Sequence, residues 1–247
     1  MKFLSHKIAK SIRKTKIYFL KDNILKNYKY NLDYIFCWMD IFKFNNPIIL
    51  DIGANIGLYS LCYKIKYSNS KIFSFEPQKN IFNIIKKNIR INNLKNIHTF
   101  NIGISNKITW GKLSIPKKEI HERYKKNINH GLFSLQTRNK DFKKCKLNTL
   151  DNFFSKRKIK KIDFVKIDVE GHEKQVLLGA INLIKKFSPI IQLEYNNLSK
   201  KLSGVKKNYY IKFAKKFNYK IGYLVMNYKF VKKLKGKQVF SDIIFYK

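Results

Sequence analysis

The sequence predicts an α/β fold, with a mostly parallel sheet and helices on both of its faces. Short apolar runs typical of buried strands alternate along most of the chain with segments whose apolar residues recur at helical spacing. A unit of strand, glycine turn and helix opens this alternation at residues 47–66. Several of the predicted strands end directly in an acidic residue. In an open α/β sheet, the carboxyl ends of the strands form the ligand-binding edge, so these acids also predict where a site lies.

The composition is that of one globular domain with a terminal extension. At 247 residues, with 45% hydrophobic and 28% charged residues, the chain is long enough to bury one large core. Its formal net charge of +38 suggests a nucleic-acid partner, but only five of its 53 basic residues are Arg. Arg is the residue whose rigid fork reads phosphates and guanines best. The composition therefore argues against a nucleic acid, whereas an anionic surface or substrate stays open.

Residues 1–46 indicate a helical extension, and residues 47–247 form the α/β domain. Within residues 1–20, apolar side chains form one helical stripe among basic residues. Such a helix either lies on an anionic membrane surface or covers one edge of the sheet, and both interpretations stay open. Three scattered cysteines and the lack of a signal-peptide core or membrane-spanning run favour a cytoplasmic protein. Peripheral contact with the inner membrane face through residues 1–20 is compatible with this location. The oligomeric state stays unknown.

The first strand is predicted over residues 48–50, and Asp51 ends it. Gly53 and Gly57 bracket a tight turn before the helix, with Ala54 and Asn55 between them. A side chain on this turn would hold a ligand away from the backbone, so the glycines predict a binding loop. A dinucleotide fingerprint has a second glycine where Asn55 stands. The spacing therefore favours a smaller nucleoside ligand, whose charged end meets Asp51.

The second strand ends in Glu76, and Pro77 closes it. Glu76 follows Asp51 by 25 residues, which is the length of one helical crossover. A carboxylate at this position can accept hydrogen bonds from both ribose hydroxyls of a nucleotide. A third strand, predicted over residues 97–105, turns at Gly103, whose backbone would border the base.

Residues 106–146 interrupt the regular alternation of strands and helices. They suggest an antiparallel strand over residues 110–115 followed by a basic, polar loop. An insertion of this size at the rim of a nucleoside site is a natural place for contacts with a second substrate. Asp151 is then expected to cap the N-terminus of a short helix.

A second acidic stretch follows the strand predicted over residues 164–167. Asp168 and Glu170 project from its carboxyl end, and Glu194 ends the next strand. Asp168, Glu170 and His172 alternate as D-x-E-x-H, a pattern that a metal ion could use. Metal sites usually recruit ligands from several segments, so we expect no metal here.

The C-terminal part contains a Lys-rich helix, predicted over residues 198–218, and two final strands. The strands span residues 219–225 and 240–246, with no crossover helix between them, and should pair antiparallel.

The acidic residues are few and concentrated. The chain has only 15, yet five of them end predicted strands on one side of the sheet. These five are Asp51, Glu76, Asp168, Glu170 and Glu194. An acidic cleft on a basic protein suits a cationic small molecule.

Together, these motifs resemble the FkbM family of S-adenosylmethionine-dependent methyltransferases. The matching segments are DIGANIG at 51–57, FEP at 75–77, TLD at 149–151, KIDVEGHE at 166–173 and LEY at 193–195. The resemblance implies a Rossmann-like class I methyltransferase fold, whose seven-stranded, mostly parallel sheet has an antiparallel last strand, here residues 240–246. It also implies S-adenosyl-L-methionine as cofactor and O-methylation of a hydroxyl on a sugar, glycan or secondary metabolite. Asn106 departs from the family pattern, because many relatives carry Asp there.

From these motifs we expect roles for particular residues. The expected cofactor-binding residues are Asp51, Gly53, Ala54, Asn55, Gly57, Glu76, Pro77, Gly103 and Asp168. The residues expected around the reacting centre are Asp168, Glu170, His172 and Glu194. Asp51 or Asp168 would hold the amino group of the cofactor, and one of the other three would serve the acceptor as base. The alternatives are methylation of a nitrogen or of a nucleic-acid ribose, and a non-catalytic basic module on the same fold that binds RNA or membrane.

Overall fold

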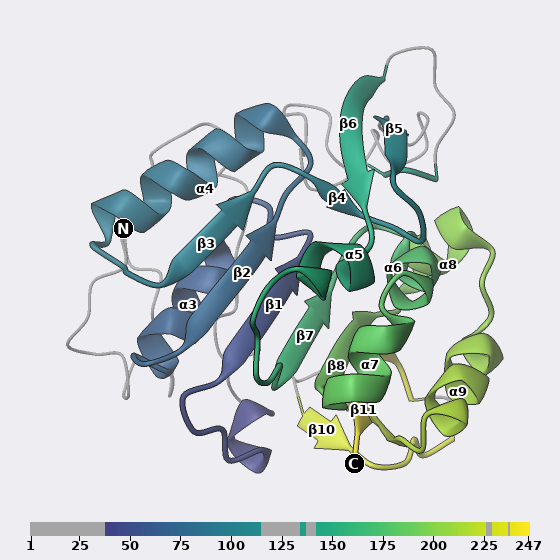
Figure 1. Cartoon of the computed structure of the whole chain (residues 1–247). Helices are drawn as coiled ribbons and strands as arrows, with labels where there is room; N and C mark the ends of the chain where they lie inside the picture. The colour runs from purple at the N-terminus through teal and green to yellow at the C-terminus, as the bar shows by residue number, and fades with distance from the viewer. Residues whose placement is uncertain (1–37, 115–133, 137–141, 226–228, 237) are drawn as a thin grey trace, which may run out of the picture.

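An eight-stranded mixed sheet forms the centre of the protein (Figure 1). The computed structural model describes residues 38–114, 134–136, 142–225, 229–236 and 238–247. In this part of the chain the strands follow the order β10-β9-β11-β8-β7-β1-β2-β3. The connections run outward in opposite directions from β1 and β7, and such a switch point is where open α/β sheets bind their ligands.

Five neighbouring strands pair in parallel, and the remaining three join the sheet through antiparallel pairs. β1 pairs in parallel with β2 and β7, while β2 continues to β3 and β7 to β8. β11 is antiparallel to both of its neighbours, β8 and β9, as predicted for the last strand of the chain. The short β10 adds an eighth strand to the seven that the family resemblance implies. The strands of this sheet are β1 Ile48–Ile52, β2 Lys71–Phe75, β3 Ile97–Phe100, β7 Phe164–Ile167, β8 Ile190–Glu194, β9 Lys220–Val225, β10 Lys229–Val231 and β11 Phe240–Tyr246.

Helices cover both faces of this sheet, and the strands are therefore continuous apolar runs. Successive residues of a strand face opposite sides, so Ile49 and Leu50 of β1 belong to different core clusters. Leu50 and Val165 pack under α5, α6, α7 and α9, whereas Ile49 and Phe164 pack with α3 and Trp38. The helices are η1 Met39–Ile41, α3 Leu58–Lys66, α4 Lys79–Ile91, α5 Leu150–Ser155, α6 Glu173–Leu178, α7 Ile181–Phe187, α8 Asn197–Ser203 and α9 Lys207–Lys216.

A second, three-stranded sheet stands beside the carboxyl ends of the main strands. It consists of β4 (Gly103–Ile104), β5 (Thr109–Leu113) and β6 (Lys143–Asn148), in the order β4-β6-β5. The third strand predicted over residues 97–105 is therefore two strands, because β3 ends at Phe100 and β4 pairs in the other sheet. The Asn101 side chain holds the turn between them by donating to the Glu76 and Pro77 carbonyls, at 2.9 and 3.0 Å.

A glycine divides each of two helical segments. The segment from Glu173 to Phe187 breaks at Gly179, where an added Cβ would lie 1.9 Å from the Ser105 carbonyl oxygen. The close approach of that backbone leaves room only for glycine. The Lys-rich helix expected over residues 198–218 breaks at Gly204, which has a φ of +66° and ends α8.

Asp151 caps a different helix from the one expected. Thr149 is the N-cap of α5, and its side chain accepts from the Asn152 amide. The Asp151 carboxylate instead accepts from the amides of Asn182 and Leu183, in the first turn of α7. The expectation was wrong because Asp151 already lies inside α5, from which it can reach across to a neighbouring helix.

Two sequence-based predictions concern segments outside the described residues. The helix expected within residues 1–46, including the membrane contact at residues 1–20, falls there up to residue 37. So does most of the insertion at residues 106–146. In the part of the chain that is described, no helix has the length and hydrophobicity needed to cross a bilayer.

Candidate active site

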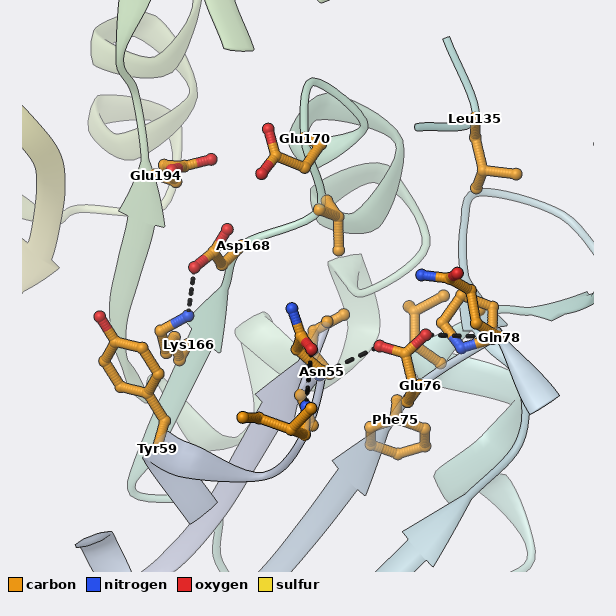
Figure 2. A pocket seen from close by; sticks show the side chains of 18 of the residues that line it. Asn55, Tyr59, Phe75, Glu76, Gln78, Leu135, Lys166, Asp168, Glu170 and Glu194 are labelled. Atoms are coloured by element: carbon orange, nitrogen blue, oxygen red, sulfur yellow. Dashed lines mark hydrogen bonds and ion pairs between the residues drawn. The ribbon is translucent and has the colours of Figure 1, made fainter. Parts of the chain in front are cut away.

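A cavity of about 220 Å³ lies at the carboxyl ends of β1, β2, β7 and β8 (Figure 2). The glycine turn after β1, residues 75–78 at the end of β2, Lys166 of β7 and residues 168–170 after β7 form most of its lining. Glu194 of β8 borders one side, and Leu113 and Leu135 border another. The predicted site residues that line it are Gly53, Ala54, Asn55, Glu76, Pro77, Gly103, Asp168, Glu170 and Glu194. Asp51, Gly57 and His172 are absent from its lining.

The glycine turn has the predicted position, but its glycines are needed for a different reason. Gly53 and Gly57 have φ values of +82° and +91°, which glycine adopts without strain. A Cβ on Gly53 would lie 1.9 Å from the Asp168 carbonyl oxygen, and one on Gly57 would lie 2.5 Å from Ile85 of α4. Both glycines therefore permit close packing between protein segments. Gly53 brings the turn against the end of β7, and Gly57 brings it against α4.

Asp51 lies beneath the cavity. Its side chain is 0% exposed, and its Oδ2 accepts from the Ser60 hydroxyl of α3 at 2.6 Å. Burial raises the pKa of Asp51, which the charge of Lys166 partly opposes. The expectation that Asp51 meets the charged end of a ligand is therefore corrected. Of the two residues predicted for that contact, Asp168 is the one that reaches the cavity.

Glu76 is buried at the end of β2 and is held by the turn that it borders. Its Oε2 accepts from the Asn55 amide at 3.0 Å, and its Oε1 accepts from the Gln78 amide at 2.8 Å (Figure 2). Burial nevertheless raises the pKa of this carboxyl to about 7. Each carboxylate oxygen has a second lone pair. The side chain can therefore accept two further hydrogen bonds from a ligand with adjacent hydroxyls.

Three carboxylates gather on the opposite side of the cavity, from two strand ends and one loop. Asp168, Glu170 and Glu194 each have an oxygen within 4.8 Å of the others (Figure 2). Glu170 Oε2 and Glu194 Oε2 are buried and have no hydrogen-bond partner within the described part of the chain. Burial raises the pKa values of Glu170 and Glu194 well above their ordinary range, and the charge of Asp168 raises them further. Such a group can hold an organic cation or share a metal ion.

Lys166 places one positive charge against this acidic group. It follows Val165 in β7, and its Nζ donates to Asp168 Oδ2 at 2.6 Å. The Nζ also lies 3.9 Å from the centroid of the Tyr59 ring. Burial alone would lower the pKa of Lys166, but Asp168 and Asp51 raise it above its ordinary value. The ammonium group therefore stays charged and fixes the position of Asp168.

His172 belongs to the support of the site and not to the cavity. Its side chain is 7% exposed, and burial lowers its pKa to about 4. Gln136 Nε2 lies 2.8 Å from Nδ1 and can only donate, so the ring proton is on Nε2, 2.9 Å from the Ser105 hydroxyl. Both ring nitrogens thus have protein partners. The expectation that His172 faces an acceptor is corrected, and the ring is also turned away from the D-x-E-x-H arrangement that the sequence offered as a less favoured alternative.

Several lining residues lay outside the sequence-based prediction. Lys166 lies within an apolar strand and Tyr59 within a helix, so the sequence pattern around them does not mark them as site residues. Lys166 is nevertheless the first residue of the KIDVEGHE segment. Leu135 reaches the cavity from a segment that is anchored at Ser134, whose hydroxyl donates to the Glu170 carbonyl at 2.6 Å. Sequence spacing carries no signal for that contact.

A parallel sheet with a cavity at its switch point, a glycine turn after β1 and an acid after β2 define a class I methyltransferase fold. A solved structure agrees: the FkbM methyltransferase of Methylobacillus flagellatus KT superposes with a TM-score of 0.56 at 16% identity. The alignment covers 86% of this chain and 48% of that one.

The chain belongs to the FkbM methyltransferase family, because the model of the methyltransferase FkbM domain matches residues 51–221. It is 27% identical over 158 residues to methyltransferase sdnD of Sordaria araneosa, covering 55% of this chain and 61% of that protein. It is 25% identical over 147 residues to methyltransferase 1 of Beauveria bassiana, covering 55% of this chain and 59% of that protein. The chain thus spans about three fifths of the length of these curated relatives.

Proposed function

We propose that this methyltransferase uses S-adenosyl-L-methionine to methylate a hydroxyl group of a sugar, glycan or secondary metabolite. The observation that carries the proposal is the gathering of Glu76, Asp168, Glu170 and Glu194 on one cavity. The protein has only 15 acidic residues against 53 basic ones, so four acids on one small cavity mark a site for a cation.

The cavity residues fit the chemical groups of that cofactor. Glu76 offers two lone pairs to a pair of ribose hydroxyls, because each of its oxygens accepts a single backbone amide from the residues that the structure describes. The unpartnered oxygens of Glu170 and Glu194, together with Asp168, suit the ammonium and sulfonium charges. Lys166, beside Asp168, would complement a carboxylate. Each charged or hydroxyl-bearing part of the cofactor thus has a complementary group on the cavity.

The cofactor supplies an electrophilic methyl group, so the protein's tasks are to orient the acceptor and to take up its proton. Orientation is worth at most about 7–11 kcal/mol of the barrier. The hydroxyl must lose a proton as it attacks, and a base works best when its pKa is close to the working pH. Burial moves the pKa values of Glu170 and Glu194 upward, in that direction. A bound cation favours their ionised form, which is the form that accepts the proton.

Two measurements test the proposal. Calorimetry with S-adenosylhomocysteine measures cofactor binding, and incubation with methyl-labelled cofactor and a panel of glycans measures transfer. We expect binding, transfer to an oxygen located by mass spectrometry, and a large loss of turnover in Glu170→Gln combined with Glu194→Gln. Asp242→Asn, a change at a buried acid outside the cavity lining, is the matched control. An N-methylated product, or full turnover in the double variant, would overturn the proposal.

A further inference from the structure

A second hollow, which we call the Trp110 groove, opens beside the active-site cavity. It has a volume of about 670 Å³ and runs between the start of α4 and strands β5 and β6. Pro77, Gln78 and Leu113 line both the groove and the cavity. A molecule bound along the groove would therefore reach the place where methyl transfer is proposed to occur.

The charge of the groove is opposite to that of the cavity. Lys79, Lys143, Lys144 and Lys146 line it, and none of its described lining residues is acidic. Of these, Lys79, Lys144 and Lys146 take part in none of the ion pairs of the described residues, whose acids Asp40, Asp163 and Asp168 all lie outside the groove. These three lysines therefore add their positive charges within one concave surface, where low-dielectric walls strengthen the field.

The groove also offers a flat aromatic surface and amide groups. Trp110 of β5 is 63% exposed, although large apolar side chains are usually covered. It pairs across the strands with Lys146, whose Nζ lies 5.6 Å from the centroid of the Trp110 ring. Asn80, Asn83 and Asn101 line the remaining wall. Sugars present apolar C–H faces that bury well against an aromatic ring, and hydroxyls that pair with amides.

We propose that the Trp110 groove binds the methyl acceptor and selects an anionic glycan, one that carries carboxylate or phosphate groups. The proposal rests on the proposed function, because it assigns the acceptor class of that same reaction. Lysines would pair with the anionic groups while Trp110 packs on a sugar ring. RNA is also anionic and can stack on Trp110. The groove has no Arg among its described lining residues, and Arg is the side chain that binds phosphates bidentately, so the glycan is favoured.

Tryptophan fluorescence gives a direct assay, because the two tryptophans of this chain differ in exposure. Trp38 is 1% exposed and Trp110 is 63% exposed, so acrylamide quenching reports on Trp110. The probes are hexagalacturonate, maltohexaose phosphate, neutral maltohexaose and hexauridylate. We expect the two charged sugars to protect Trp110 in a saturable manner, with protection falling as salt is raised, and maltohexaose to bind at least tenfold more weakly.

Charge variants locate the binding surface. Lys144→Gln combined with Lys146→Gln should weaken binding of hexagalacturonate by about three- to tenfold at low ionic strength. The matched control is Lys215→Gln with Lys216→Gln, two exposed lysines on α9, at the opposite end of the domain in Figure 1. Equal losses in both pairs, equal binding of charged and neutral sugars, or tightest binding of hexauridylate would overturn the proposal.

The same samples separate this proposal from the one on which it rests. If S-adenosylhomocysteine binds but no charged sugar protects Trp110, the acceptor class is wrong and the methyltransferase proposal stands. If S-adenosylhomocysteine does not bind, the proposed function fails, and protection of Trp110 then shows only a glycan-binding groove.

Discussion

Replacing Gly53 with alanine would press a methyl group against the end of β7. An added Cβ would lie 1.9 Å from the Asp168 carbonyl oxygen and 3.2 Å from Cγ1 of Val169. Gly53 also has a φ of +82°, in the region that side chains other than glycine rarely adopt. The substitution therefore combines backbone strain with an overlap against backbone atoms that lie beside the cavity.

Both contributions can be given a magnitude. A left-handed conformation costs a residue with a Cβ about 1–2 kcal/mol, and overpacking in a tight interior costs about 1–3 kcal/mol. The expected loss in the free energy of unfolding is thus about 2–5 kcal/mol, a large part of the roughly 5–15 kcal/mol available to a typical domain. Because the overlap is with the backbone of Asp168, the end of β7 must move, and affinity for S-adenosylhomocysteine should fall as well.

Urea unfolding measures the loss, and Gly204→Ala is the control. Gly204 has a φ of +66° but no atom within 4 Å of an added Cβ, so its substitution adds strain without overlap. We expect Gly204→Ala to cost about 1 kcal/mol and to leave cofactor affinity unchanged. Equal losses in the two variants would refute the argument that Gly53 is needed for close packing against Asp168.

Three further substitutions test the charges in and around the site. Glu76→Gln should weaken S-adenosylhomocysteine binding by about 10- to 100-fold in calorimetry, because hydrogen bonds to a charged group are worth about 1.5–3 kcal/mol. Asp151→Asn is the control, because the Asp151 carboxylate also accepts from two amides but lies outside the cavity lining. This variant should bind S-adenosylhomocysteine normally, and an equal loss of affinity would contradict the role of Glu76. Burial raises the pKa of Asp242 to about 8, so in the folded protein this carboxyl keeps a proton that it releases above about pH 4 in the unfolded chain. The proton therefore stabilises the folded state at low pH, and this contribution to the unfolding free energy is lost as the pH rises to about 8. Asp242→Asn should therefore make the fall in unfolding free energy between pH 5 and 8 shallower by up to about 1 kcal/mol per pH unit, and parallel profiles would show that the group is not protonated. Lys166→Met should cost about 3–5 kcal/mol in urea unfolding, because it leaves the partly buried Asp168 without its partner, and a loss below about 1 kcal/mol would contradict that pairing.

The sheet and its acidic edge were predictable because they depend on short-range patterns. The apolar runs of β1, β2, β7 and β8 are buried on both faces, which requires a continuous apolar sequence and makes each strand end visible. The parallel direction of these strands then places Glu76, Asp168 and Glu194 at one edge. The short β10 was missed because three residues carry too little pattern to predict a strand.

The orientation of individual side chains was harder to predict. His172 was expected beside Asp168 and Glu170 because alternate residues of an extended strand face the same side. The strand ends at Ile167, however, and positive φ values at Glu170 and Gly171 turn the chain. The alternation therefore stops before His172, whose ring packs toward Ser105 and Gln136 instead.

The burial of Asp51 was also beyond the sequence, because it depends on a helix that packs across the strand. Asp51 has the same local context as an exposed strand end, namely an apolar run followed by a glycine. Ser60 of α3 closes over it, donating to its Oδ2 at 2.6 Å and lying 2.7 Å from Ser74 of β2. β1 also continues to Ile52, so Asp51 lies inside the strand and not at its end, between Ser74 of β2 and Lys166 of β7.

The net charge of +38 therefore conceals two surfaces of opposite sign at the proposed reaction centre. The cavity concentrates acids whose pKa values are raised by burial, such as Glu170 and Glu194. Burying like charges together is unfavourable, and a bound cation relieves that repulsion. The Trp110 groove concentrates lysines, which stay hydrated and can exchange water for an anionic group. A cationic methyl donor and an anionic acceptor would each be repelled from the other's surface. On this argument, the distribution of charge along the shared wall of Pro77, Gln78 and Leu113 sets the orientation of the two substrates before any contact with the reacting atoms is made.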